Sequence, residues 1–519
     1  MTLLEKPATT MPAPLDGSSM AGPPTDGPPK DGPQARWMRW VGAAGVVVGG
    51  GVISGFWTPR GPVTATESLV TMLLALASGV GAGWLLRSRW GVLALPILHV
   101  LAFEVTRLPA LGPTVDMLNV SGIYGVLAAV SGRGVHGLLV FPALVAGGLV
   151  GGAIARGRRY GLVTGGRRVL DVASIGLGAL AVVALGTTVV VPARTEPIRG
   201  ADGRVVAGSV AELTRVSVTG GELNVLIRGV SATNPVLLYL AGGPGGSEFG
   251  AMRRHGDALE QDFVVATLDQ RGTGSSYDQL EPLATHTLAN AVTDVIEVSE
   301  LLRTRFGQQQ VYLVGQSWGT IIGVLAAEQR PDLFAAFVGV GQMVDVAETD
   351  RIFYDDTLAW ARLRGDAPLV AQLEAAGPPP YSNLLDYPVV FADEQQVYRY
   401  DHSGNAEGAG QMLENVPVSE YSPLDTVNIV RGLLDTYSAL YPQLQDLDLR
   451  QSAAELKVPV YLAEGRFEPR GRKDLARDWF QQLRAPAKRW VEFDTSGHRP
   501  LFEQPAEFAQ LMRTVAAER

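Results

Sequence analysis

Long apolar stretches occupy most of the chain between residues 37 and 192 and restrict what it can fold into. In hydrocarbon every backbone polar group needs an internal hydrogen bond, so only helices and closed barrels cross a bilayer. A bilayer requires roughly 20 residues per helix, and candidates lie at residues 39–57, 66–86, 90–107, 136–155 and 170–191. Residues 117–130 are apolar but short and could form a re-entrant or surface helix. The pattern predicts an all-α transmembrane region of about five helices over residues 37–192.

The segment before this region has a different composition. Residues 1–36 are rich in Pro, Gly, Ser and Thr, which is typical of disordered chain. Residues 56–60, at the end of the first apolar stretch, offer no small-residue cleavage site. We therefore expect residues 1–36 to be disordered and the first apolar stretch to stay in the mature protein.

Basic residues are unevenly distributed among the segments that connect the apolar stretches, and cytoplasmic loops carry the excess of Lys and Arg. One side of the membrane would hold Lys30, Arg36, Arg39, Arg87, Arg89, Arg156, Arg158, Arg159, Arg167 and Arg168. The other side would hold Arg60, Arg107, Arg133, Arg194 and Arg199. With an odd number of spans, this asymmetry predicts an integral protein of the cell membrane, embedded in the lipid bilayer, with an extracytoplasmic C-terminal part.

Net charge and cysteine content argue against several kinds of partner and site. The formal net charge of −9 argues against a nucleic-acid partner. The chain has no cysteine, which excludes disulfides and thiolate metal sites. No motif implies a metal or another cofactor, and the oligomeric state is left open.

A G-x-S-x-G pentapeptide, Gly315-Gln316-Ser317-Trp318-Gly319, stands in the C-terminal part. It follows an apolar run typical of a strand, residues 311–314, and precedes a helical pattern, residues 320–328. Glycines on both sides of a serine allow the sharp strand-to-helix turn that exposes its hydroxyl at the carboxyl edge of a parallel sheet. The pattern predicts Ser317 as a catalytic nucleophile.

Such a serine needs a base, and the base needs a carboxylate that orients it. His498 follows the last predicted strand, residues 488–493, and is the candidate base. The candidate acid is Glu468, which lies beyond the Gly465 turn after a predicted strand at residues 458–463. Glu464, at the strand end, and Asp494, close to His498 in sequence, are the alternatives.

A second glycine-rich segment, residues 242–246, follows a predicted strand at residues 236–240. Backbone N–H groups at such a position stabilise the negative oxygen that develops on a substrate carbonyl. The candidate donors are the N–H groups of Gly243 and of Trp318, the residue after the nucleophile. A phosphate-binding loop is disfavoured because no Lys-Ser or Lys-Thr pair follows the glycines.

The segments Gly242-Gly243-Pro244-Gly245-Gly246, Asp269-Gln270-Arg271-Gly272-Thr273-Gly274-Ser275-Ser276 and the Ser317 pentapeptide together resemble the prolyl aminopeptidase (proline iminopeptidase) branch of the α/β-hydrolases. The resemblance covers residues 205–519. It implies an eight-stranded, mostly parallel sheet with a helical cap, and hydrolysis through an acyl-enzyme. Ala241 stands where these enzymes usually carry a His, and Glu468 where they usually carry an Asp.

These observations predict an α/β-hydrolase core at residues 205–341 and 456–519, interrupted by a helical cap at residues 342–455. Acidic residues of the cap could bind a cationic amino terminus or form a solvated face. The residues lining the substrate pocket are not identified by the sequence. We expect a membrane-anchored serine hydrolase that cleaves a small peptide amide through Ser317, Glu468 and His498. An esterase or lipase acting on a lipophilic ester, and a non-catalytic membrane binding or sensor protein, are the alternatives.

Overall fold

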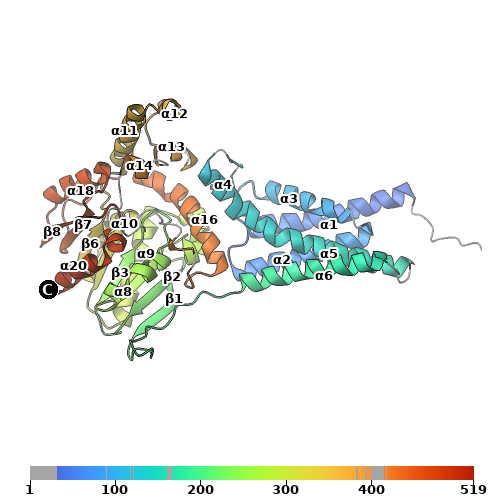
Figure 1. Ribbon diagram of the computed structural model, residues 1–519, viewed down its shortest axis with the longest axis horizontal. Helices are drawn as coiled ribbons and strands as arrows, with labels where there is room; N and C mark the ends of the chain where they lie inside the picture. Colours follow the sequence, from blue (N-terminus) through green and yellow to red (C-terminus); the bar gives the residue numbers. More distant parts are fainter. Residues whose placement is uncertain are drawn as a thin grey trace, which may run out of the picture.

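The computed structural model describes residues 32–518, except 89–90, 117, 121, 161–165, 382–383, 392–393, 399–413 and 417. A bundle of long helices and an α/β part lie end to end along the longest axis of the molecule (Figure 1). Most of the segment that we expected to be disordered, residues 1–31, lies outside the described residues. Its last residues belong to α1, which begins at Pro33. Proline is favoured at a first helical position because the N–H that it lacks would have no partner there.

Four helices of the described chain are long and apolar enough to cross a membrane. They span Pro33–Trp57, Ala65–Leu86, Ile123–Gly157 and Val169–Val189. The third combines α4 (Ile123–Ala129), the π turn η2 (Val130–Gly134) and most of α5 (Val135–Tyr160), and the fourth lies within α6 (Gly166–Val189). The short apolar segment at 117–130 is thus largely the start of a 35-residue helix, because the π turn continues the helix through Gly132 and Gly134.

The predicted span at 90–107 is shorter than the other four. It consists of the 3-10 turn η1 (Gly91–Ala94) and α3 (Leu95–Thr106), which lies beside α1 (Figure 1). At its C-terminal end Arg107 donates to the Pro59 carbonyl, at 3.1 Å, in the loop between α1 and α2 (Ala65–Leu86). In the described part of the chain, the bundle therefore comprises four long apolar helices and this shorter one.

The tightest helix contact in the bundle joins α2 to α5 through glycines. A Cβ added to Gly79 or Gly83 would lie 2.1 or 2.0 Å from the Leu144 or Gly148 carbonyl oxygen of α5. The reciprocal holds for Gly147 and Gly151, which face carbonyl oxygens of α2 at 2.1 and 2.0 Å. Each pair is separated by three residues, the small-residue spacing that lets helix backbones approach closely in membranes.

The α/β part contains one eight-stranded sheet in the order β1-β2-β4-β3-β5-β6-β7-β8. The strands are β1 (Val210–Val218), β2 (Gly221–Gly229), β3 (Val236–Leu240), β4 (Val264–Asp269), β5 (Val311–Gln316), β6 (Phe334–Val340), β7 (Val460–Gly465) and β8 (Lys488–Phe493). The pairs β1–β2 and β2–β4 are antiparallel, and all other neighbours are parallel. This sheet confirms the predicted α/β-hydrolase architecture.

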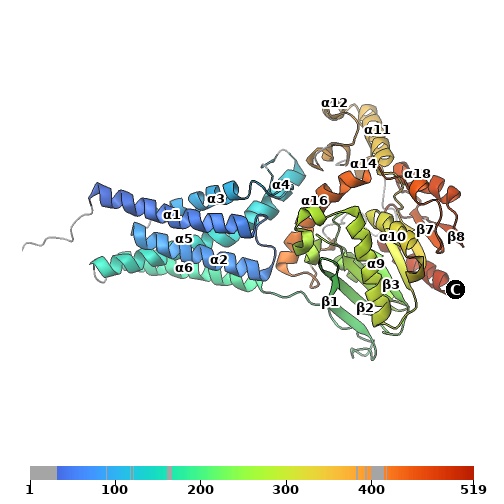
Figure 2. The same ribbon diagram turned by 180° about the vertical axis from the view of Figure 1, so that it is seen from behind.

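Helices cover both faces of the sheet (Figure 2). One face packs against α9 (Leu288–Arg305), α10 (Trp318–Gln329) and α18 (Arg470–Gln482). The other face packs against α7 (Phe249–His255), α8 (Asp257–Glu260), α19 (Pro500–Glu503) and α20 (Pro505–Ala517). The central strands β3, β4, β5 and β6 are buried along their whole length, as expected for parallel strands covered on both faces.

Helices also fill the insertion between β6 and β7. These are α11 (Val346–Arg364), α12 (Ala367–Ala376), η6 (Leu384–Asp386), α13 (Pro388–Phe391), α14 (Glu394–Val397), α16 (Pro423–Leu440), η8 (Tyr441–Leu444) and α17 (Leu449–Ser452). Figures 1 and 2 show α16 between the sheet and the helix bundle. A capping box at Ser422 and Asp425, with Pro423 in the first turn, defines where α16 begins.

Candidate active site

Ser317 lies in a sharp turn between β5 and α10. Its backbone has φ 54° and ψ −119°, a conformation that L-residues rarely adopt. The turn requires glycine on both sides of the serine, because backbone atoms occupy the space that a side chain would need there. A Cβ on Gly315 would lie 2.4 Å from the Gly319 oxygen, and one on Gly319 would lie 2.3 Å from the Leu240 oxygen. Strain of this kind, held by close packing, is a feature of functional residues.

His498 and Glu468 come together from loops that follow β8 and β7. The distance between His498 Nδ1 and Glu468 Oε2 is 2.9 Å, and the Glu468 side chain is fully buried. Arg472, in the first turn of α18, donates through Nε to Glu468 Oε1. Burial alone raises the pKa of the Glu468 carboxyl, but the charges of His498 and Arg472 outweigh burial and lower that pKa below its ordinary value. Glu468 is therefore an anion that faces the imidazole.

The two alternative acids lie elsewhere. Glu464, within β7, accepts the Gln342 backbone N–H at 2.9 Å. Burial, followed by the charge of Glu468, raises the pKa of the Glu464 carboxyl well above its ordinary value. Asp494 is exposed on the loop after β8. Of the three carboxyl groups, Glu468 is the one that contacts His498.

The two candidate oxyanion donors lie at the start of α10 and in the loop after β3. Trp318 is the first residue of α10, so its backbone N–H has no intrahelical acceptor. Gly243 has φ 119°, and a Cβ there would come within 2.6 Å of the Gly245 nitrogen. Both Gly243 and Ser317 line the same cavity.

That cavity has a volume of about 320 Å³. Its lining comprises Tyr124, Gly242, Gly243, Gly245, Gly246, Ser247, Glu248, Gln316, Ser317, Asn415, Ile429, Leu433 and His498. The Ser317 hydroxyl donates to the Met343 sulfur at 3.6 Å. A serine hydroxyl has three staggered positions, and catalytic hydrogen bonds are often formed only with substrate bound. The cavity places the serine, the imidazole and the glycine loop around one space.

One edge of the cavity is charged. Glu248 and Glu414 lie 2.8 Å and 3.3 Å from Arg499, whose side chain is almost completely buried. Burial raises the pKa of the Glu248 carboxyl, and the Arg499 charge opposes this effect. Asn415 donates to Glu248 at 3.5 Å. Two carboxyl groups share one guanidinium, so the ionised cluster has a net negative charge.

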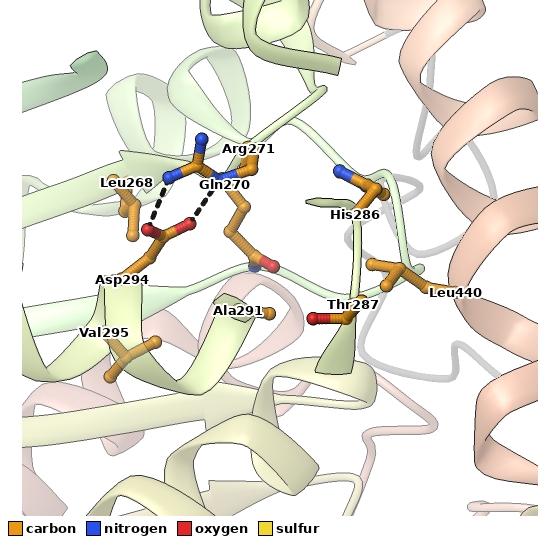
Figure 3. A pocket seen from close by; sticks show the side chains of 9 residues that line it. All are labelled: Leu268, Gln270, Arg271, His286, Thr287, Ala291, Asp294, Val295 and Leu440. Atoms are coloured by element: carbon orange, nitrogen blue, oxygen red, sulfur yellow. Dashed lines mark hydrogen bonds and ion pairs between the residues drawn. The ribbon is translucent and has the colours of Figure 1, made fainter. Parts of the chain in front are cut away.

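The structure also identifies positioning residues that we did not predict. Gln270 accepts the Trp318 indole N–H at 2.8 Å and donates to the Ala241 carbonyl at 3.0 Å. It therefore connects the loops after β3 and β4 to the serine turn. The only indication of this role in the sequence is that Gln270 lies in the motif at residues 269–276. Arg271, the next residue, is held by Asp294 of α9 through two bonds of 2.8 and 2.9 Å, beside a separate small cavity (Figure 3).

Gly341, directly after β6, is a second such residue. It has φ 57°, and a Cβ there would lie 2.7 Å from His498 Nδ1. Glu503 of α19 is a third, because it accepts the Gly497 N–H at 2.6 Å and so fixes the loop before the histidine. Tyr124 is a cavity-lining residue from α4, and nothing in its local sequence indicated that role.

Comparison with known proteins is consistent with this geometry. A family model for the alpha/beta hydrolase fold matches residues 235–505. A probable aminopeptidase, YbaC of Bacillus subtilis, is 28% identical over 305 residues, which cover 59% of this chain and 96% of that protein. A probable proline iminopeptidase of Streptomyces coelicolor is 29% identical over 104 residues, 20% of this chain and 32% of that protein.

Solved structures show a similar extent of coverage. The proline iminopeptidase of Mycobacterium smegmatis is 19% identical with a TM-score of 0.42, and the match covers 59% of this chain and 98% of that one. The family model matches just over half of the chain, and the region includes the serine turn, both loops and the histidine. The chain belongs to the alpha/beta hydrolase fold family, and its C-terminal region is similar to a probable aminopeptidase and, over a shorter stretch, to a probable proline iminopeptidase.

Proposed function

We propose that the protein is a membrane-anchored serine hydrolase that cleaves small peptide amides with a free amino terminus. The contact between Glu468 and His498, with Ser317 on the same cavity, carries this proposal. Ser317 attacks the carbonyl carbon, and His498 takes the hydroxyl proton and later gives a proton to the leaving amine. Glu468 orients the imidazole and stabilises its cationic form. Water then hydrolyses the acyl-enzyme by the same route.

Negative charge develops on the substrate carbonyl oxygen during both acylation and hydrolysis of the acyl-enzyme. The N–H groups of Gly243 and Trp318 are the proposed donors for that oxygen, since both belong to loops at the cavity. Gln270 holds the two loops together through the Trp318 indole and Ala241. A donor that is already in place needs no reorganisation as the charge forms.

Specificity for an amino terminus is supported by the acidic edge of the cavity. Glu248 lines the cavity, and Glu414 lies behind it against the same Arg499. A protonated amine that approached Glu248 would balance the second carboxylate. The similarity to a probable aminopeptidase agrees with this assignment.

An ester substrate with an apolar part is the second candidate. Tyr124, Ile429 and Leu433 give the cavity an apolar side, and Tyr124 belongs to the helix that enters the bundle. An esterase would use the same nucleophile and histidine but would not need Glu248.

We propose that the four long helices and the shorter one anchor the protein in a membrane, with the hydrolase part outside the cytoplasm. Arg60 and Arg133, assigned to the outer side, pair with Glu281 and Glu104. Their positive charge is thereby balanced within the protein, whereas Arg36, Arg87 and Arg156, described members of the richer basic set, lie at or near the opposite helix ends. This distribution follows the positive-inside rule.

The direct test uses the full chain in detergent or nanodiscs. A panel of aminoacyl anilides, the same anilides with blocked amino groups, and p-nitrophenyl esters would be assayed with the wild type and with Ser317→Ala and Glu248→Gln. We expect anilide cleavage that needs a free amino group, is lost in Ser317→Ala and is weakened through KM in Glu248→Gln. Cleavage of esters alone would replace the peptidase by an esterase, and activity in Ser317→Ala would refute the nucleophile.

A further inference from the structure

The helix that begins at Ile123 is too long for the bilayer alone. Its 35 residues extend over about 52 Å, whereas the hydrocarbon core is about 30 Å thick. The excess lies at the end nearest the sheet, where α4 projects toward the cap (Figure 1). A segment of the membrane helix thus stands beside the catalytic cavity instead of within the bundle.

Tyr124 lies in the first turn of α4 and lines the cavity that contains Ser317 and His498. The neighbouring wall comes from α16, where Ile429 and Leu433 line the same cavity. These two residues are four positions apart and therefore share one face of the helix. An aromatic ring from one part of the protein and two aliphatic side chains from the other thus enclose one side of the space near the serine.

The separation between these walls is fixed by buried polar contacts. Arg431 of α16 is fully buried and donates through Nε and Nη2 to the Ser131 carbonyl in the π turn, at 3.0 and 2.8 Å. Its Nη1 donates to the Pro62 carbonyl at 2.8 Å. Asn428, one turn earlier, donates to the Val63 carbonyl at 2.9 Å. The turn that supports α4 and the helix that faces it are therefore joined directly.

Asp435, one turn further along α16, makes the second set of contacts. It accepts from the Thr114 hydroxyl and the Tyr277 hydroxyl, both at 2.6 Å, and lies 3.2 Å from Arg60. On its other side α16 is tied to the sheet part, because Thr436 donates to the Gly272 carbonyl at 2.7 Å. Removing one partner of a buried charge is costly, so such contacts define a single arrangement of the two parts.

We infer that Tyr124 and the facing residues of α16 form a specificity subsite, in which the membrane region selects substrates by the size of an apolar substituent. This inference rests on the proposed function of Ser317 as the nucleophile, but it does not depend on whether the scissile bond is an amide or an ester. Tyr124 acts by contact with substrate, whereas Arg431 and Asp435 act by holding the opposite wall in place.

The test measures labelling rates of Ser317 in the full chain with alkyl fluorophosphonates of increasing chain length. This reagent series reports the pocket without needing the natural substrate. Tyr124→Ala is compared with Tyr124→Trp and with Val126→Ala, a control at a partly exposed position on the same helix. Thermal unfolding of each variant shows that it is folded.

We expect Tyr124→Ala to raise the ratio of long-chain to short-chain labelling rates by about 10-fold or more, because one methylene in an apolar pocket is already discriminated on that scale. Tyr124→Trp should shift the ratio in the opposite direction, and Val126→Ala should leave it unchanged. An unchanged ratio in both folded Tyr124 variants would overturn the subsite. No labelling of the wild type, by contrast, would refute the nucleophile and with it the proposed function.

Discussion

Glycine has opposite uses in the helix bundle and in the hydrolase part. In the bundle, Gly79 and Gly83 of α2 lack side chains and so let the α5 backbone approach closely. In the hydrolase part, Gly341 leaves room for one residue, His498, whose Nδ1, Cε1 and carbonyl oxygen would lie 2.7, 2.8 and 3.0 Å from an added Cβ. The first use serves helix association and depends on shape. The second serves the position of the proposed catalytic base, where a small displacement would affect catalysis far more than stability.

In the hydrolase part, the charge of a buried polar group matters as well as its shape. In the proposed triad, Glu468 accepts a hydrogen bond from the His498 imidazole, and the two atoms lie 2.9 Å apart. Glu468→Gln keeps the shape and removes the charge, so turnover should fall by roughly three to four orders of magnitude with little change in fold. Steady-state kinetics with circular dichroism would measure both. Asp494→Asn is the matched control, and a larger loss in that variant would transfer the acid to Asp494.

The second expected effect is smaller and concerns Gly341. In Gly341→Ala the new methyl would displace His498, and kcat should fall by roughly 10²-fold, the effect of an error of about 1 Å in position. Gly365→Ala is the control, because Gly365 also has a positive φ, 70°, but nothing lies within 4 Å of its Cβ position. Both variants should lose similar stability from backbone strain. Equal kinetics in the two would show that the loss arises from strain and not from the histidine.

The third effect should leave catalysis nearly intact. Gly83→Leu would force α2 and α5 apart, since even a Cβ lies 2.0 Å from the Gly148 oxygen. We expect a lower thermal midpoint in detergent, from overpacking of at least about 1–3 kcal/mol, but normal fluorophosphonate labelling at low temperature. Gly49→Leu on α1 is the control, because no atom lies within 4 Å of that Cβ position. The same loss of stability in both variants would contradict glycine-mediated packing.

The smallest effect concerns pH. The pKa of Glu468 is lowered by His498 and Arg472, so the stability from its ionised form is present above its unfolded pKa of about 4.3. That stability is lost only as the pH falls through the lower folded pKa. In Arg472→Gln the folded pKa should rise, and the loss should begin at a higher pH. Unfolding midpoints between neutral and acidic pH would detect the shift, and parallel curves for the two proteins would argue against it.

The amount that the sequence predicted also differs between the regions. Local pattern was enough for β3 at residues 236–240, because a short apolar run between turns is typical of a buried strand. The predicted strand at residues 488–493 also matches β8, which is an edge strand with charged and partly exposed residues. The α/β-hydrolase class followed from three ordered motifs. Hydropathy alone separated residues 117–130 from the predicted span at 136–155, because the Ser-Gly-Arg-Gly stretch at 131–134 interrupts the apolar pattern while the π turn continues the helix.

Part of the candidate site could be predicted from the sequence. Glu468 was preferred to Glu464 from its place beyond a turn, and the structure places it against His498. Tyr124 was not predicted, because it reaches the cavity only through the packing of α4 against α16, which no local pattern encodes. Gly341 was missed for the same reason, since its role depends on a histidine more than 150 positions later in the chain.

The buried guanidinium of Arg431 affects how far the protein is modular. Most of its acceptors are main-chain carbonyls of the bundle, at Ser131 and Pro62. A fragment that begins after α6 would lose those acceptors and expose the guanidinium to water, so α16 would no longer be held in place from the bundle side. Such a fragment would also lack Tyr124, so its substrate range would not represent that of the whole chain. The two parts are separate in sequence, but the position of α16 and the lining of the cavity depend on both. Substrate specificity should therefore be measured on the intact chain.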